Sequence, residues 1–228
     1  NGKNISLIGA DSSNTIIDGG QNRSVVTFNS AENNSSVLKN FTITNGSGFI
    51  IPDGSTKGGG IYASGAGPIL ENLIITGNAA TRGGGVLSQG NNSMMLRNSR
   101  LHANNSIAGG GGLWLDGNFD SETFQTIDNV TIHNNSSSSM GGGIKLYNNR
   151  SKITNCSVKN NSGSNGGGVY SWKSQSTITN SFIDNNVTNN GQGGGLYATQ
   201  SQTKVINSSI SYNESIDDYG AGIYNISG

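Results

Sequence analysis

The sequence feature that most constrains the fold is a glycine triplet that returns at a nearly fixed interval, each time followed by Ile, Val or Leu. The intervals run from 25 to 31 residues, and a second marker, an Asn with an aliphatic residue three positions later, keeps the same register. The last glycines of the triplets are Gly60, Gly85, Gly112, Gly143, Gly168 and Gly195, with Gly222 at the end of a Gly-Ala-Gly unit in the same register. Such a repeat is too short for a propeller blade and lacks helical periodicity, so it predicts a solenoid with one turn per repeat.

Hydrophobic alternation around each Asn marker predicts short β-strands. Aliphatic side chains two positions before, one after and three after the Asn should face the core, as in Leu70, Leu73 and Ile75. Another short strand follows each glycine triplet, for example Ile61-Tyr62-Ala63. We therefore predict an all-β fold, a right-handed parallel β-helix of about eight rungs with about three short strands in each. Residues 1–228 would form a single β-helix domain, part of a larger protein.

Equivalent positions on rungs that lie roughly 4.8 Å apart form columns along the axis of such a fold. One column consists of Asn alone, and its amides are predicted to hydrogen-bond from rung to rung. The glycines are predicted to serve bends that need a positive φ or have no room for a Cβ, because no strand-to-helix context supports a phosphate-binding loop. The Asn column contains Asn78, Asn104, Asn135, Asn161, Asn186 and Asn213.

The charge content argues against several classes of partner. Charged residues make up 11% of the chain, 13 basic and 13 acidic, with no block of like charge. We therefore expect no nucleic-acid partner and no direct membrane insertion, since no stretch is apolar enough to span a bilayer. The single cysteine, Cys156, excludes an internal disulfide, and its column places it in the core.

Two stretches carry a resemblance to known proteins. The opening ISLIGA and NTIIDGG, with VLKNFTITNG, resemble the first rungs of right-handed parallel β-helix proteins of the pectate-lyase-like fold. The later GGGIY…N-x-x-[IVL]-x-x-N units are similar to repeats of chlamydial polymorphic outer-membrane proteins and of adhesin-like surface proteins, although those often carry Phe where this chain has Ile, Leu or Val. The resemblance implies an extracellular or cell-surface location. It leaves activity open, because this fold hosts lyases, hydrolases and non-catalytic adhesins.

Outward positions on the strands that follow the glycine triplets carry both tryptophans and five of the seven tyrosines. Such a stripe can contact sugar rings or dock a surface protein, because aromatic rings offer apolar area with a polar tip. Two alternatives remain open: the rings stabilise one another along the column, or a flanking segment covers them. The predicted ligand-binding residues are Tyr62, Trp114, Tyr147, Tyr170, Trp172, Tyr197 and Tyr224.

Another outward column carries the best candidates for catalysis. A polysaccharide lyase needs a base that titrates near the working pH and a cation that neutralises a sugar carboxylate. Outward polar residues on a solvated sheet are the ordinary alternative. A hydrolase would use paired carboxylates, whereas Glu71, Arg97 and Asp128 alternate in sign and predict cross-strand ion pairs. The catalytic candidates are Arg100, His102, His133, Lys159 and Asp184.

The longest repeat contains an insertion rich in oxygen-bearing side chains, and calcium is the only cofactor that the sequence suggests. The candidate ligands are Asp116, Asn118, Asp120 and Glu122. The insertion lacks the glycine of an EF-hand loop, and Asp and Asn are common in ordinary loops. The other long excursion, Gly46 to Lys57, is expected to be a surface loop over the early rungs.

The leading functional prediction is an adhesin or structural stalk that binds a polysaccharide or a surface protein through the aromatic stripe. The alternative is a polysaccharide lyase or hydrolase that acts on acidic polysaccharide, which would need long loops that wall the histidine-bearing face. A third prediction is a purely structural solenoid that associates end to end with further copies.

Overall fold

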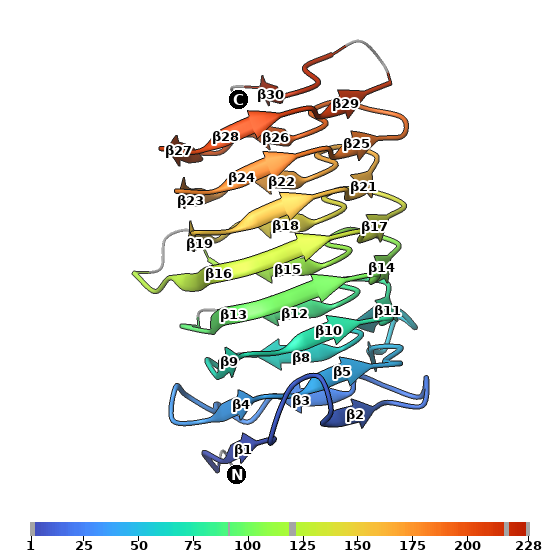
Figure 1. The fold of residues 1–228 in the computed structure, drawn as a ribbon, viewed down its shortest axis with the longest axis vertical. Coiled ribbons are helices and arrows are strands. Elements are labelled where there is room, and N and C mark those ends of the chain that lie inside the picture. The colour runs from blue at the N-terminus through green and yellow to red at the C-terminus, as the bar shows by residue number, and fades with distance from the viewer. Residues whose placement is uncertain (1–2, 91, 119–121, 217–218, 227–228) are drawn as a thin grey trace.

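The computed structural model describes residues 3–90, 92–118, 122–216 and 219–226. These residues form β-strands that stack rung upon rung in three parallel sheets (Figure 1). The seven strands after the glycine triplets and the Gly-Ala-Gly unit, together with β3 (Val26–Phe28), form the eight-stranded glycine sheet, one strand per rung, which confirms the predicted number of rungs. Its strands are β3 (Val26–Phe28), β8 (Ile61–Ser64), β12 (Val86–Gln89), β15 (Leu113–Asp116), β18 (Ile144–Tyr147), β22 (Val169–Trp172), β26 (Leu196–Thr199) and β30 (Ile223–Ile226).

The largest sheet, here called the bent sheet, contains the strands on both sides of the Asn marker. Figure 1 shows it in front of the glycine sheet. Its strands are β1 (Ser6–Ile8), β2 (Ile16–Asp18), β4 (Val37–Lys39), β5 (Thr42–Thr44), β9 (Ile69–Glu71), β10 (Ile74–Thr76), β13 (Met95–His102), β16 (Gln125–His133), β19 (Arg150–Thr154), β20 (Ser157–Lys159), β23 (Gln175–Thr179), β24 (Phe182–Asp184), β27 (Lys204–Ile206) and β28 (Ser209–Ser211).

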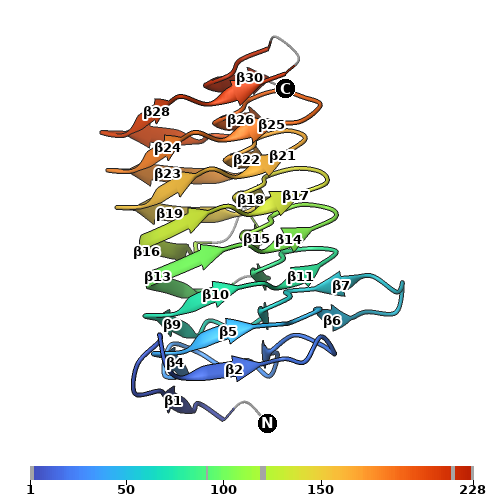
Figure 2. The ribbon, with the colours of Figure 1, turned by 45° about the vertical axis from the view of Figure 1, so that its right-hand side comes forward.

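Two-residue strands form the third, narrow sheet at one edge of the solenoid. They are β11 (Ala79–Ala80), β14 (Asn105–Ser106), β17 (Ser136–Ser137), β21 (Ser162–Gly163), β25 (Val187–Thr188) and β29 (Glu214–Ser215). The excursion predicted as a surface loop is instead an antiparallel hairpin of β6 (Phe49–Ile50) and β7 (Thr56–Lys57), which projects from the early rungs in Figure 2. The described residues include no helix that could cross a bilayer.

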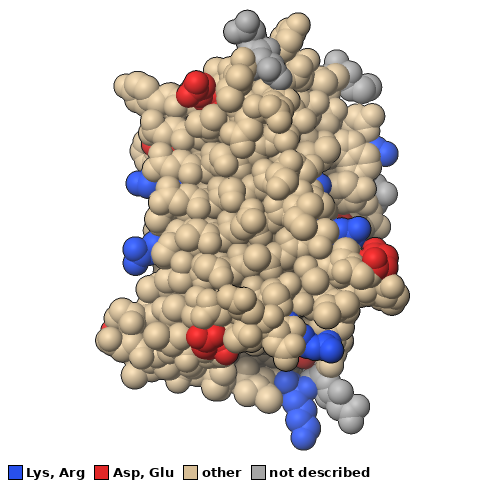
Figure 3. All heavy atoms as spheres, turned by 90° about the vertical axis from the view of Figure 1, so that its right-hand side faces the viewer, with Lys and Arg blue, Asp and Glu red and all other residues tan. Residues whose placement is uncertain are grey.

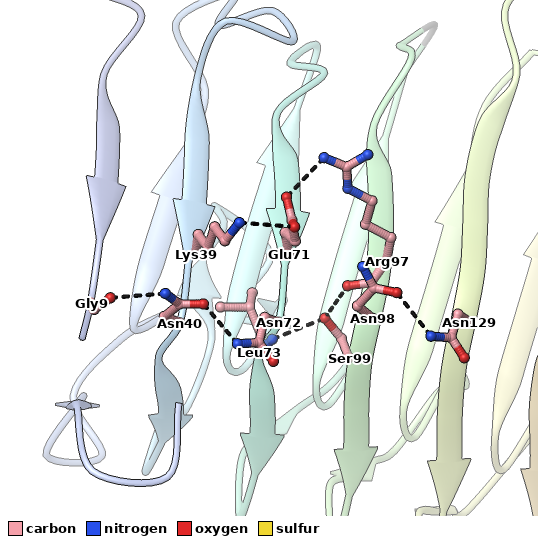
Figure 4. A network of polar contacts seen from close by, with 10 residues as sticks. All are labelled: Gly9, Lys39, Asn40, Glu71, Asn72, Leu73, Arg97, Asn98, Ser99 and Asn129. Carbon is pink, nitrogen blue, oxygen red and sulfur yellow. Dashed lines mark hydrogen bonds and ion pairs between the residues drawn. The ribbon is translucent and has the colours of Figure 1, made fainter. Parts of the chain in front are cut away.

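The Asn marker is the point where the bent sheet turns. Its seven residues all have φ between +46° and +65°, a left-handed conformation that Asn tolerates better than most residues. Their exposed amides also bond between rungs, for example Asn72 Nδ2 to Asn40 Oδ1 at 2.7 Å (Figure 4). This exposed Asn row consists of Asn40, Asn72, Asn98, Asn129, Asn155, Asn180 and Asn207.

The interior is filled by the columns that the alternation predicted. Leu70, Leu73 and Ile75 are each at most 1% exposed, and the equivalent residues of neighbouring rungs join them in one hydrophobic core. Cys156 is buried in this core, and burial raises the pKa of its thiol to about 11. Burial of each aliphatic side chain contributes about 1.5–3 kcal/mol, so this continuous column is the main source of stability.

The predicted Asn column is a buried ladder beside this core. Asn135 Nδ2 donates to Asn161 Oδ1 at 3.0 Å, and Asn135 Oδ1 accepts from Asn104 Nδ2 at the same distance. Each of the three side chains is 1% exposed. The amides therefore satisfy the buried polar groups of the bend between the bent and narrow sheets.

The first and last glycines of a triplet have different roles: one needs a positive φ, and the other has no room for a Cβ. Gly141 has a φ of +68°, which an L-residue with a side chain rarely adopts. Gly143, two positions later, has no such φ, but a Cβ there would lie 2.7 Å from the carbonyl oxygen of Gly168 on the next rung. The triplet therefore shapes a bend at its first residue and permits close stacking at its last.

Candidate functional site

All seven predicted aromatic residues lie on the outward side of the glycine sheet. Parallel pairing places Tyr170 beside Tyr197 and Tyr197 beside Tyr224 in one column, and Tyr147 beside Trp172 in the next. Ring centroids are 5.2 Å apart for Tyr170–Tyr197 and 5.4 Å for Tyr197–Tyr224. Tyr147 and Trp172 stack at 4.5 Å. The sequence therefore identified the correct face and the correct neighbours.

Three of these outward rings are buried. Tyr62, Trp114 and Tyr170 are 5%, 6% and 7% exposed. Phe49 of the hairpin stacks on Tyr62 at 5.2 Å, while the side chain of Lys145 lies over Trp114. Tyr62 and Trp114 therefore lie under a neighbouring segment or side chain, an alternative that the sequence left open, and ligand binding by the three rings stays a prediction.

The four remaining rings are half-buried and define the aromatic row: Tyr147, Trp172, Tyr197 and Tyr224. Stacking covers much of each ring face, so the row presents ring edges, phenol hydroxyls and the indole to solvent. Lys173 Nζ lies 4.5 Å from the centre of the Trp172 ring and adds a cation at its rim. The row suits a ligand that offers apolar C–H groups and hydroxyls along an extended chain.

Lys145 is buried between Trp114 and Tyr170 in the same outward column, and no sequence pattern pointed to it. Its Nζ donates to the carbonyl oxygen of Ala108 at 2.9 Å and lies 4.0 Å from the centre of the Trp114 ring. Gly109 makes room for this side chain, because a Cβ there would lie 2.5 Å from Lys145 Cδ. Burial, with a smaller contribution from Arg82, lowers the pKa of Lys145 to about 8. The extra glycine in Gly109–Gly112 was the one available signal.

Asp116 shares this face and is the first of the predicted calcium ligands. Burial raises the pKa of its carboxyl, and the nearby cations Lys57, Arg82 and Lys145 oppose that shift. The surroundings of Asp116 are therefore cationic, which disfavours a metal ion there. Asn118 and Glu122 are exposed, and Asp120 lies outside the described residues.

Within the described ranges, no group of three or more His, Cys, Asp or Glu side chains could hold a metal ion. Calcium binding by the insertion therefore stays a prediction.

Replacement of Lys145 by Met tests the burial of its charge. Below pH 8 the amine is charged in both the folded and the unfolded protein, and burial of that charge destabilises the folded state. As the pH rises from 8 to 10.5 the folded protein no longer carries the charge, so the contribution of Lys145 to the free energy of unfolding increases across that interval. We expect the difference in free energy of unfolding, native minus variant, to rise by about 3 kcal/mol between these pH values. Urea denaturation at each pH measures it.

The tyrosines titrate in both proteins, so their contribution cancels in this difference, including that of Tyr170, whose pKa burial raises to about 12. A difference that stays constant with pH would contradict the assignment of a buried charge to Lys145.

The bent sheet brings the catalytic candidates together, as their column predicted. His102 pairs with His133, His133 with Lys159, and Lys159 with Asp184 on successive rungs. The imidazole rings stack with centroids 5.0 Å apart and planes 13° apart. Burial is the main cause that lowers the pKa of each histidine, and Arg100 contributes to both shifts.

Two shallow grooves on this sheet lie beside other residues and not at the histidines. One is lined by Asn180, Phe182 and Asn207 with adjacent serines, and the other by Lys152 and three threonines. His102 and His133 are half-buried on the flat strands between the bend and the narrow sheet. The candidates thus share a surface but line neither of these grooves.

Of the predicted ion pairs on the other side of the bend, Glu71–Arg97 forms, while no pair between Arg97 and Asp128 is found among the described residues. Glu71 accepts from Lys39 Nζ at 3.0 Å and from Arg97 at 2.8 Å, and these bonds lower the pKa of Glu71 (Figure 4). Asp128 accepts from Asn155 Nδ2 at 2.9 Å. This column is neutralised internally and has no carboxylate pair for hydrolysis.

The narrow sheet presents few side chains that could act as acids, bases or charged ligands. Its outward side chains include Asn105, Ser136 and Ser162, which are polar and uncharged. Figure 3, which looks onto this side, shows Lys, Arg, Asp and Glu side chains mainly along its margins. The glycine sheet and the bent sheet therefore carry the two candidate sites.

Comparison with known proteins bears on the fold. The chain matches the family described as right handed beta helix region over residues 9–228. No curated protein and no solved structure matched it. Because the match covers almost the whole chain and agrees with the parallel stacked rungs, this protein belongs to the right-handed β-helix family.

Proposed function

We propose that the protein is an extracellular or cell-surface β-solenoid module, an adhesin or stalk, that binds carbohydrate through the aromatic row. The observation that carries this proposal is the stacking of Tyr147 with Trp172, and of Tyr197 with Tyr224, on one half-exposed face. Rings on successive rungs repeat along the axis, so an extended glycan can contact several of them. Repeated weak contacts of this kind add up by avidity.

The polar surroundings of the row favour a glycan over an apolar protein segment. Thr199 follows Trp172 in the same column, and Gln89 lies lower on the same face. Gln89 donates from Nε2 to the hydroxyl of Tyr62 at 2.9 Å, which shows how amide and phenol groups bond on this sheet. A surface protein is the other partner that the row could bind.

The test is a glycan-array screen of the protein and of a Trp172→Ala, Tyr197→Ala double variant. We expect the double variant to bind about tenfold or more weakly, because truncated aromatic anchors typically cost more than 1 kcal/mol each. Tyr212→Asn is the matched control, since Tyr212 is 85% exposed, lies outside the row and has a φ of +52° that Asn tolerates. Unchanged glycan binding by the double variant would contradict the proposal.

The second candidate is a polysaccharide lyase on the bent sheet, supported by the adjacency of His102, His133 and Lys159. Formation of unsaturated uronate products, followed by ultraviolet absorbance on acidic glycans, tests it. Product formation that is lost in the His133→Ala variant would favour the lyase. If the unaltered protein forms no product, the lyase is contradicted and carbohydrate binding is the candidate function that is left.

End-to-end self-association remains a third proposal. Apolar side chains are exposed at both ends of the described solenoid, including Ile8, Ile16 and Ile223. Analytical ultracentrifugation over a range of protein concentrations distinguishes a chain of stacked copies from a monomer.

A further inference from the structure

Four basic or titratable side chains form a cationic patch on the bent sheet: Arg100, His102, His133 and Lys159. The register places His102, His133 and Lys159 on three successive rungs of one outward column. Arg100 lies on the same strand as His102, two residues earlier, and is exposed. Side chains of one charge type therefore meet across neighbouring strands.

The arrangement contrasts with the charged column on the other side of the bend. There, Lys39, Glu71 and Arg97 alternate in sign and pair. Among the described residues, neither Arg100 nor Lys159 forms an ion pair. Like charges opposite one another on adjacent strands are destabilising. Among the described residues of this column, Asp184 is the acidic side chain next to the patch, opposite Lys159, and no ion pair joins the two, so the patch lacks the bonded counter-ion that the column across the bend has.

The groups that surround the histidines supply no such counter-ion. On the preceding rung, the Thr76 hydroxyl lies 3.2 Å from His102 Nδ1 and carries no charge. On the following rungs stand Lys159 and then Asp184, which accepts from the Asn185 amide at 2.8 Å. Across the bend, Glu71 is bonded to its two cations and Asp128 accepts from Asn155. Arg150 and Lys152, on the strand that pairs with β16, add positive charge there.

We propose that the cationic patch binds the sulfate groups of a sulfated polysaccharide, and that acidification strengthens this binding. At neutral pH the two imidazoles are uncharged, and Arg100 and Lys159 alone attract an anion. Protonation of both histidines adds two positive charges to the patch, more than the single carboxylate of Asp184 can offset. A bound sulfate offsets the repulsion between the stacked imidazolium rings.

The geometry favours a polymer over a free anion. The patch lies on a flat, solvent-facing sheet, so a single small ion would be held by few groups. Its members repeat along the solenoid axis, so successive sulfates of an extended chain can each meet one. Sulfate is favoured over carboxylate because a sulfate ester stays fully charged at pH 5, whereas carboxyl groups with a pKa near 4 have begun to take up protons at that pH.

The chain contains two histidines, so nuclear magnetic resonance of the imidazole protons reports on this patch alone. We expect both histidines to titrate below the ordinary range in the free protein, because burial and neighbouring cations lower each pKa. Dextran sulfate should raise both pKa values, because anion binding and proton uptake are reciprocal. Neutral dextran should leave them unchanged. Histidine pKa values that dextran sulfate does not move would overturn the proposal.

Binding of dextran sulfate at pH 5 and pH 8 provides the second measurement. We expect tighter binding at pH 5, by about tenfold when both histidines are protonated in the complex, since each added charge contributes like an exposed ion pair. The His102→Gln, His133→Gln variant should lose this pH dependence, and Arg100→Gln should weaken binding at both pH values. Arg97→Gln is the matched control on the same strand, since Arg97 is already paired with Glu71, and should bind as the unaltered protein does.

Two outcomes would show that the ligand of the cationic patch is not a sulfated polysaccharide. Polygalacturonate that binds more tightly than dextran sulfate at pH 5 would overturn the choice of sulfate. Single-stranded DNA that competes as well as dextran sulfate at equal charge would overturn the choice of a polysaccharide. The patch lies on a different sheet from the aromatic row, so Trp172→Ala, Tyr197→Ala should leave dextran sulfate binding intact whether or not the row binds a neutral glycan.

Discussion

Replacement of Asn135 by Ala is expected to lower the free energy of unfolding by about 3–5 kcal/mol. The Asn135 amide donates to the carbonyl oxygens of Leu101 and His133 and to Asn161 Oδ1, all within 3.1 Å. Its oxygen accepts from the backbone and side chain of Asn104. Each buried partner left without a bond costs about 1–3 kcal/mol, and water cannot reach these groups at 1% exposure. Urea denaturation monitored by circular dichroism measures the loss.

The exposed Asn row provides the matched control. Asn129→Gly also removes one inter-rung amide bond, from Asn129 Nδ2 to Asn98 Oδ1 at 2.8 Å, but at the surface. Glycine keeps the φ of +52° at this position without strain. We expect a loss of about 1 kcal/mol or less, since water replaces an exposed hydrogen bond. Equal losses in the two variants would show that the buried ladder has no special role.

The repeat predicted the architecture because a parallel solenoid makes sequence spacing and spatial position equivalent. Once the glycine triplet and the Asn marker agreed in register, residues one repeat apart had to be neighbours. Leu101 therefore lies beside Ile132, and His102 beside His133. The buried Asn ladder followed from the same alignment. In a fold with long-range crossovers, periodicity alone would not have placed side chains on a common face.

The exposure of side chains on a face was not predictable in the same way. Tyr62 points outward as expected, but Phe49 covers it, and Phe49 belongs to an excursion that the repeat does not include. Lys145 reaches a neighbouring rung and occupies the space that Gly109 leaves. Both contacts depend on departures from the repeat, about which the repeat carries no information.

One local conformation was missed although the residue type signalled it. The Asn marker was interpreted only as a register mark, and positive φ was assigned to glycines alone. Asn72 and its equivalents also adopt a left-handed φ. Asn tolerates that conformation because its short amide bonds locally, so a repeated Asn between two strand halves could have predicted the bend of the large sheet.

Replacement of Gly143 by Ala is expected to cost about 3 kcal/mol or more of unfolding free energy. The added Cβ would lie 2.7 Å from the carbonyl oxygen of Gly168 and 2.9 Å from both Asn161 Nδ2 and a methyl group of Val158. The oxygen belongs to the next rung, and the amide is held in the buried ladder, so neither can move without loss of inter-rung hydrogen bonds. Urea denaturation gives the change in midpoint, which we expect without a change in slope.

Within the 228-residue chain, Gly222 is the matched control because it occupies the same column. A Cβ there would meet only a methyl group of Ile210 at 3.9 Å, an ordinary contact. Neither position has a positive φ, so the two substitutions differ in steric surroundings and not in backbone strain. We expect Gly222→Ala to change stability by about 0.5 kcal/mol or less. A comparable loss in both variants would mean that the glycine is needed for chain conformation, whereas a loss at Gly143 alone would show that the column is glycine because the rungs stack too closely for any side chain.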